Sequence, residues 1–93
     1  MQTLLLPGIS KDDKTWVDET AQRLKSEAVE GIIRPFYWMH WTDESQTFDT
    51  QEKAELIAKH LRGEKANIIA KDEGLEVANL LKAMIPDQIN SIK

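Results

Sequence analysis

Apolar residues along the chain form short continuous runs that alternate with longer amphipathic stretches. The runs at residues 3–6 and 67–70 predict strands buried on both faces, as in a parallel sheet covered by helices. The branched and aromatic run 32–38 predicts a further strand. Pro35 within it has no N–H for a ladder hydrogen bond, so we expect this strand at a sheet edge. The alternating tail 88–93 predicts a short fourth strand.

Three stretches carry apolar residues at spacings of three and four, which predicts amphipathic helices. The first helix is expected over residues 14–28, where Asp12 or Asp13 can cap the first turn. The second helix follows a polar loop and begins at a capping box formed by Asp49 and Glu52.

The second helix is expected to end at Gly63, and the third to run over residues 74–84 until Pro86 stops it. Alternating strands and helices predict an α/β fold, a three-layer α/β/α sandwich on a parallel sheet of three to four strands. We expect the flavodoxin-like strand order 2-1-3-4 and a single domain over residues 1–93. The inward-facing helical residues are expected to be Trp16, Val17, Ala21, Leu24, Ala28, Ala54, Ile57, Ala58, Leu61, Val77, Leu80, Leu81 and Met84.

Composition narrows the classes of function. The chain has 93 residues, 41% of them hydrophobic and 30% charged, and its formal charge of −4 gives no reason to expect nucleic acid or an anionic membrane as a partner. No stretch approaches the roughly 20 apolar residues of a membrane span. The absence of cysteine excludes a disulfide framework, a thiolate metal site and a cysteine nucleophile, and it fits a reducing, cytoplasmic location. No glycine-rich phosphate loop is present, and we predict no cofactor.

The segment 67–78 has the form of a nucleophile elbow, in which a strand turns sharply into a helix. Small residues, Ala70 and Gly74, flank the central Asp72 at spacings of two. Small flanks are needed because such a turn leaves little room for side chains and projects its central residue at the carboxyl end of the sheet.

Three segments together resemble the amino-terminal half of an α/β hydrolase: T-L-L-L-P-G-I-S, F-Y-W-M-H-W and N-I-I-A-K-D-E-G. The resemblance implies that Gly8 and Ile9 lie in the oxyanion loop and that Asp72 occupies the nucleophile position. It also implies that the backbone N–H of Glu73 is the second oxyanion donor.

The chain departs from that family in three ways. Pro7 and Gly8 replace the usual His-Gly of the oxyanion loop, aspartate replaces the nucleophilic serine, and the strands that carry the triad acid and histidine are missing. We interpret the chain as an excised, engineered or designed fragment.

Each candidate site residue has a structural alternative. Asp72 is a candidate nucleophile, since some α/β hydrolases attack carbon with aspartate, and His40 is then the candidate base. Alternatively, Asp72 and Glu73 cap the following helix, and His40 belongs to an aromatic cluster. His60 is expected on the surface. Several acidic residues could together bind a divalent cation through their oxygens, or they could be solvated caps and loop charges. We favour the second interpretation and predict no metal site from Asp12, Asp13, Asp43, Glu44 and Asp72.

These observations favour a compact α/β-hydrolase-like scaffold without efficient catalysis. One alternative is a minimal hydrolase that acts on a small ester or a C–X bond through Asp72. The other alternative is a homo-oligomeric assembly module, for example a homodimer that pairs through a sheet edge.

Overall fold

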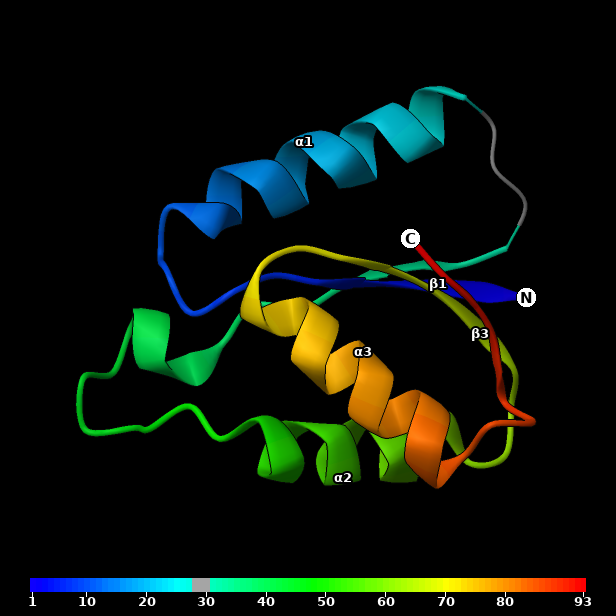
Figure 1. The fold of residues 1–93 in the computed structure, drawn as a ribbon. Coiled ribbons are helices and arrows are strands. Elements are labelled where there is room, and N and C mark those ends of the chain that lie inside the picture. Colours follow the sequence, from blue (N-terminus) through cyan, green and yellow to red (C-terminus); the bar gives the residue numbers. More distant parts are fainter. Residues whose placement is uncertain (28–30) are drawn as a thin grey trace.

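The computed structural model describes residues 1–27 and 31–93, over which strands and helices alternate (Figure 1). Ala28, which was expected to complete the inward face of the first helix, lies outside the described residues. The elements are β1 (Gln2–Leu6), α1 (Asp13–Ser26), β2 (Ile33–Pro35), the short 3-10 helix η1 (Met39–Trp41), α2 (Thr50–Leu61), β3 (Ala66–Ala70), α3 (Glu73–Met84) and β4 (Ile89–Ile92).

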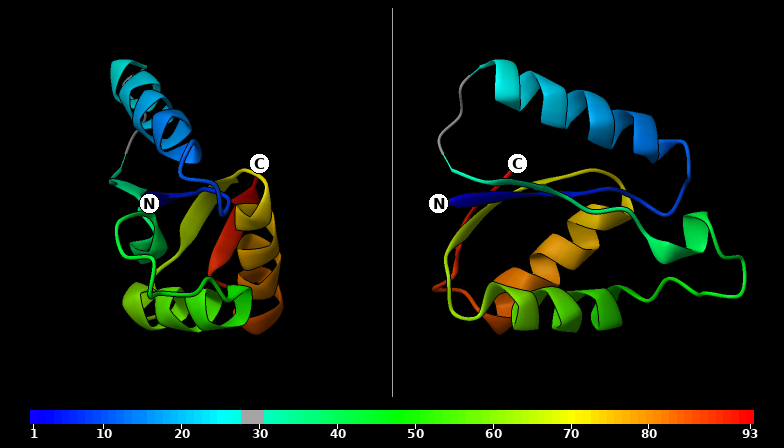
Figure 2. Two further views of the ribbon diagram at one scale, coloured as in Figure 1. Left: turned by 90° about the vertical axis from the view of Figure 1, so that its left-hand side faces the viewer. Right: turned by 180° about the vertical axis from the view of Figure 1, so that it is seen from behind.

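The four strands form one parallel sheet in the order β2-β1-β3-β4, which confirms the predicted α/β class and the flavodoxin-like order. Helix α1 covers one face of the sheet, and α2 and α3 cover the other (Figures 1 and 2). Leu4 of β1 pairs with Arg34 of β2 and with Ile68 of β3. Strand β1 is therefore central, and all five of its residues are buried.

The hydrophobic core lies on both sides of β1. Three consecutive leucines in β1 are fully buried because helices cover both faces of the strand. The core residues of the three helices are Val17, Ala21, Leu24, Ala54, Ile57, Leu61, Val77, Ala78 and Leu81. Most of these were predicted from helical spacing. Met84 was expected inward, but it is 40% exposed at the end of α3.

Strand β2 is much shorter than the predicted run 32–38. Only Ile33–Pro35 belong to the sheet, at its edge, as the proline indicated. The Phe36 N–H still donates to the Leu5 oxygen at 3.1 Å, and the chain then leaves the ladder and leads into η1. The aromatic character of residues 36–38 predicted a longer strand, but Phe36 packs against the core, Tyr37 bonds to Asp18 of α1 and Trp38 bonds to the Pro7 carbonyl.

The helix starts differ in detail from the predicted caps. The Asp49 side chain accepts a hydrogen bond from the Gln51 backbone N–H at 3.0 Å, so Asp49 caps α2 as expected. The α1 cap position is Asp12, whose side chain makes no capping hydrogen bond. Asp13, the first residue of α1, is buried and bonds to a neighbouring loop. None of the described helices is both long and apolar enough to cross a membrane.

Candidate functional site

The sharp turn predicted between β3 and α3 is present, with Asp72 at its centre. Asp72 has φ 52° and ψ −128°, and residues other than glycine rarely adopt a positive φ. Two residues later, a Cβ atom on Gly74 would collide with the carbonyl oxygen of Leu6 at the end of β1. A small residue is therefore required at position 74, because α3 begins directly against the neighbouring strand.

The loop after β1 lies beside this turn, and the amide groups of its Gly8 and Ile9 are already hydrogen-bonded. The Gly8 N–H donates to Oδ2 of Asp13 at 2.8 Å, and the Ile9 N–H donates to Oε1 of Glu73 at 2.8 Å. Asp13 is only 6% exposed, so its carboxylate belongs to the packed loop. Of the two N–H groups that the hydrolase resemblance assigns as oxyanion donors, that of Ile9 thus binds a carboxylate of the chain itself, and so does the neighbouring Gly8 N–H.

Aromatic side chains bind the carbonyl groups of the same loop. Trp38 donates from Nε1 to the Pro7 oxygen at 3.0 Å, and Trp41 donates from Nε1 to the Ile9 oxygen at 2.8 Å. Nε2 of His40 also lies 2.6 Å from the Ile9 oxygen. Because a carbonyl oxygen has two lone pairs, the Ile9 oxygen can accept hydrogen bonds from both Trp41 and His40.

His40 is oriented toward the loop and not toward the elbow. A carbonyl oxygen only accepts, so Nε2 of His40 donates this hydrogen bond and carries a proton. Nδ1 is buried without a hydrogen-bond partner, and the ring packs edge-on against Phe48 at 5.5 Å between centroids. In the described chain no hydrogen bond joins His40 to Asp72, so the structure does not pair the candidate base with the candidate nucleophile.

Three acidic side chains surround Gly8. A Cβ atom built on Gly8 would lie 2.6 Å from Cβ of Asp72, 2.6 Å from Oε1 of Glu73 and 2.7 Å from Oδ2 of Asp13. Asp72 is 52% exposed at its side chain and lies 3.5 Å from Nζ of Lys71. The centre of the site is therefore negatively charged, with one exposed lysine at its rim.

The acidic residues weighed as cation ligands do not form a site. Over residues 1–27 and 31–93, no group of three histidine or acidic side chains has the arrangement to hold a metal ion. Asp43 instead accepts hydrogen bonds from the Ser45 hydroxyl at 2.6 Å and from its backbone N–H at 3.0 Å. The Ser45 hydroxyl bond, together with the backbone bond, lowers the pKa of Asp43 below its ordinary value.

Sequence reasoning placed Gly8, Ile9, Asp72 and Glu73 together, but it missed what the Glu73 side chain does. The hydrogen bond between Ile9 and Glu73 joins residues 64 positions apart, and no local pattern indicates such a pair. The aromatic cluster did indicate packing near His40, although it did not reveal that the indole N–H groups hold the loop.

The parallel sheet, its 2-1-3-4 order and the turn after β3 define an α/β protein of flavodoxin-like topology. Comparisons of the chain with protein-family models, with curated proteins and with solved structures give no match.

Proposed function

We propose that the chain is a compact α/β-hydrolase-like scaffold that does not catalyse efficiently as it stands. The observation that carries the proposal is that the Ile9 N–H, one of the two expected oxyanion donors, is bound by the Glu73 carboxylate, while the neighbouring Gly8 N–H is bound by Asp13. Oxyanion stabilisation needs N–H groups that are free to meet the charge of the transition state. Here an incoming oxyanion has to displace a bound carboxylate.

The charges around the loop add to this effect. Asp13, Asp72 and Glu73 all lie around Gly8, and like charges at such distances repel a developing oxyanion. Hydrolysis of a covalent ester intermediate also needs a base that activates water. His40, the candidate base, is engaged with the Ile9 carbonyl. These contacts support a structural role for the elbow.

A minimal hydrolase that uses Asp72 is the second candidate, because one observation favours it. Asp72 has an exposed carboxylate on a backbone with positive φ, and strained backbone positions cluster at functional sites. The substrates would be small activated esters or C–X compounds, on which the carboxylate attacks carbon and displaces the alkoxide or halide.

Turnover of a panel of activated esters and haloalkanes separates these two functions. The parent chain, Asp72→Ala and Asp72→Ser are each compared with buffer, and folding is checked by circular dichroism. The scaffold proposal predicts that none of the three exceeds the buffer rate. Saturable turnover by the parent that Asp72→Ala abolishes would overturn the proposal and establish Asp72 as a nucleophile.

The assembly alternative remains a prediction for the two sheet edges, β2 and β4. Both edges carry features that disfavour strand addition: Pro35 has no N–H in β2, and the β3–β4 register shifts between Ala66 and Asn67. We therefore rank edge-paired homodimers below the scaffold. Light scattering at micromolar concentrations tests this ranking of the two proposals, and a dimer mass would favour the assembly module.

A further inference from the structure

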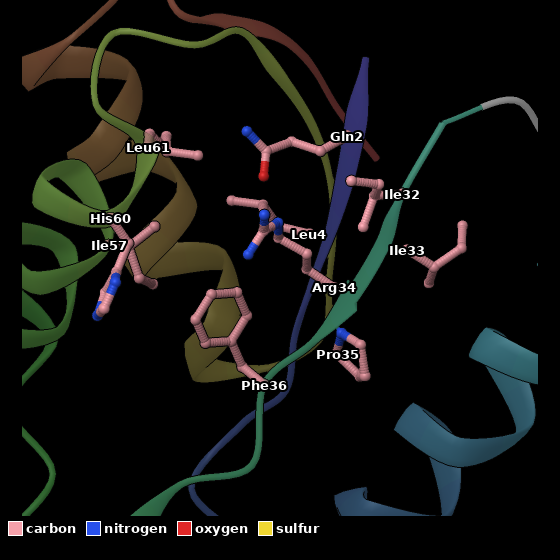
Figure 3. Close-up of a pocket in the computed structure, with 10 residues that line it drawn as sticks. All are labelled: Gln2, Leu4, Ile32, Ile33, Arg34, Pro35, Phe36, Ile57, His60 and Leu61. Carbon is pink, nitrogen blue, oxygen red and sulfur yellow. The ribbon is translucent and has the colours of Figure 1, made fainter.

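A groove separates the sheet from α2 on the side of the molecule where β2 forms the edge (Figure 3). Its volume is about 530 Å³, which lies within the range of about 300–1,000 Å³ typical of small-molecule sites. Gln2, Leu4, Arg34 and Phe36 point from the strands toward α2, whereas Ile33 and Pro35 point away toward α1 (Figure 3). The groove shares no residue with the elbow.

The walls of the groove are mainly apolar. Leu4, Ile57 and Leu61 are core residues at its base, and Phe36 is partly buried against them. Ile32 adds accessible apolar surface at the rim, where it is 60% exposed. An apolar segment of a ligand can therefore be buried here.

Arg34 is the charged group in this groove. Its side chain points into the opening between the sheet and α2 (Figure 3). Within the described part of the chain, Arg34 takes part in no ion pair, although the protein carries 16 acidic residues and a net charge of −4. A guanidinium presents a planar fork of N–H donors that matches a carboxylate.

The remaining polar groups around the groove agree with this charge. Lys65 and Glu64 line a smaller adjoining recess that shares Arg34. The Glu64 carboxylate accepts a hydrogen bond from Nε2 of Gln2 at 3.3 Å, and its charge offsets one of the two cations, which leaves the positive charge in excess. His60 adds a further N–H donor from α2. The opening therefore favours one anionic group.

We propose that this groove binds a small carboxylate with an unbranched apolar tail, such as a medium-chain fatty acid. The carboxylate pairs with Arg34, and the tail lies between Phe36 on the sheet side and Ile57 on α2. This inference does not depend on the proposed scaffold function, because the elbow and the groove are built from different residues.

Sodium octanoate, below its micelle concentration, is the probe for this site. In a titration followed by amide NMR, we expect saturable shifts at the groove residues Gln2, Ile32, Phe36 and Ile57. Hexanoate should bind about tenfold more weakly, since each buried methylene strengthens binding about three- to fourfold. Neutral 1-octanol should also bind at least tenfold more weakly, because it forms no charged pair with Arg34.

Two variants separate the roles of charge and apolar contact. Arg34→Gln should weaken octanoate binding by about tenfold or more. Ile32→Ser should have a smaller effect, and it should weaken the binding of both octanoate and hexanoate. Arg23→Gln is the matched control, since Arg23 is an exposed arginine on α1, and it should leave the affinity unchanged. All three positions are exposed, so the variants should fold.

Each outcome decides the proposal. Groove shifts that saturate, depend on tail length and are weakened only by Arg34→Gln and Ile32→Ser support it. Shifts confined to other surfaces, no saturation, or equal affinity of the parent and Arg34→Gln would overturn it.

Discussion

At the residue scale, Asp72 combines an unfavourable backbone with an exposed side chain. Its positive φ of 52° costs free energy in any residue with a Cβ atom, and among the described residues its carboxylate pairs only with the exposed Lys71, at 3.5 Å. The side chain therefore contributes little to stability that offsets the strain. The position is held by the strand before it and the helix after it.

Replacing Asp72 with glycine should stabilise the protein. Glycine adopts positive φ without a Cβ clash, so we expect the free energy of unfolding to rise by about 1 kcal/mol. Asp72→Ala keeps the Cβ atom and should change stability only slightly. Urea unfolding of both variants measures the difference. A loss of stability in Asp72→Gly would mean that the carboxylate has a stabilising partner that outweighs the strain.

Tyr37 and Asp18 form a second residue-scale pair, near the start of α1. The Tyr37 hydroxyl donates to Oδ1 of Asp18 at 2.6 Å, and Lys14 binds the other oxygen of the same carboxylate at 2.8 Å. The hydrogen bond to Asp18, and then partial burial, raises the pKa of Tyr37 above its ordinary 10.0. The hydrogen bonds from Lys14 and from Tyr37 lower the pKa of Asp18.

Alkaline titration of Tyr37 tests this pair. A raised pKa means that the contribution of Tyr37 to stability is complete below pH 10.0 and is lost as the pH rises through the folded pKa. Tyr37 is the sole tyrosine of the chain, so tyrosinate absorbance reports it alone. We expect ionisation above pH 10.0 in the parent and near the ordinary value in Asp18→Ala. Identical titrations of the two proteins would disprove the hydrogen bond.

At the element scale, the contact between α3 and β1 fixes the elbow. Helix α3 starts so close to the end of β1 that only glycine fits at position 74. The α3 helix then buries Val77, Ala78 and Leu81 against the core. The turn geometry follows from this packing, because the helix cannot move away from the strand without exposing these side chains.

Gly74→Ala should therefore be strongly destabilising. The new Cβ would meet the backbone carbonyl of Leu6, which cannot turn aside as a flexible side chain does, and we expect a loss of about 3 kcal/mol. Gly63→Ala is the matched control. Gly63 has φ +82° and open space around it, so alanine there should cost only about 1 kcal/mol of backbone strain. Equal losses in chemical unfolding would argue against the close contact.

Elements were more predictable from the sequence than their contacts. Apolar runs located β1 and β3, because continuous apolar residues indicate a buried strand. Pro35 placed β2 at an edge, because proline has no N–H for a ladder hydrogen bond. The end of β2 was not predictable, because the aromatic residues after Pro35 favour a strand but make their contacts outside the sheet, Tyr37 with Asp18 of α1 and Trp38 with the Pro7 carbonyl. The Asp13 and Glu73 contacts with the loop depend on tertiary placement, which local patterns do not encode.

At the scale of the whole molecule, the loop after β1 is where separate parts of the chain meet. Asp13 from α1, Trp41 from η1 and Glu73 from α3 all hydrogen-bond to its backbone. The loop is thus held by the complete fold, and its amides serve structure. This arrangement supports the proposed scaffold function, and the groove beside β2 is a separate feature.

Amide hydrogen exchange at Gly8 and Ile9, followed by NMR, tests whether the two carboxylates hold the loop. The parent should protect both amides, Glu73→Ala should release Ile9 while Gly8 stays protected, and Asp13→Ala should release Gly8. Asp12→Ala, which removes a carboxylate without a capping bond, should leave both unchanged. Unprotected amides in the parent, or protection that survives the loss of both carboxylates, would contradict the account.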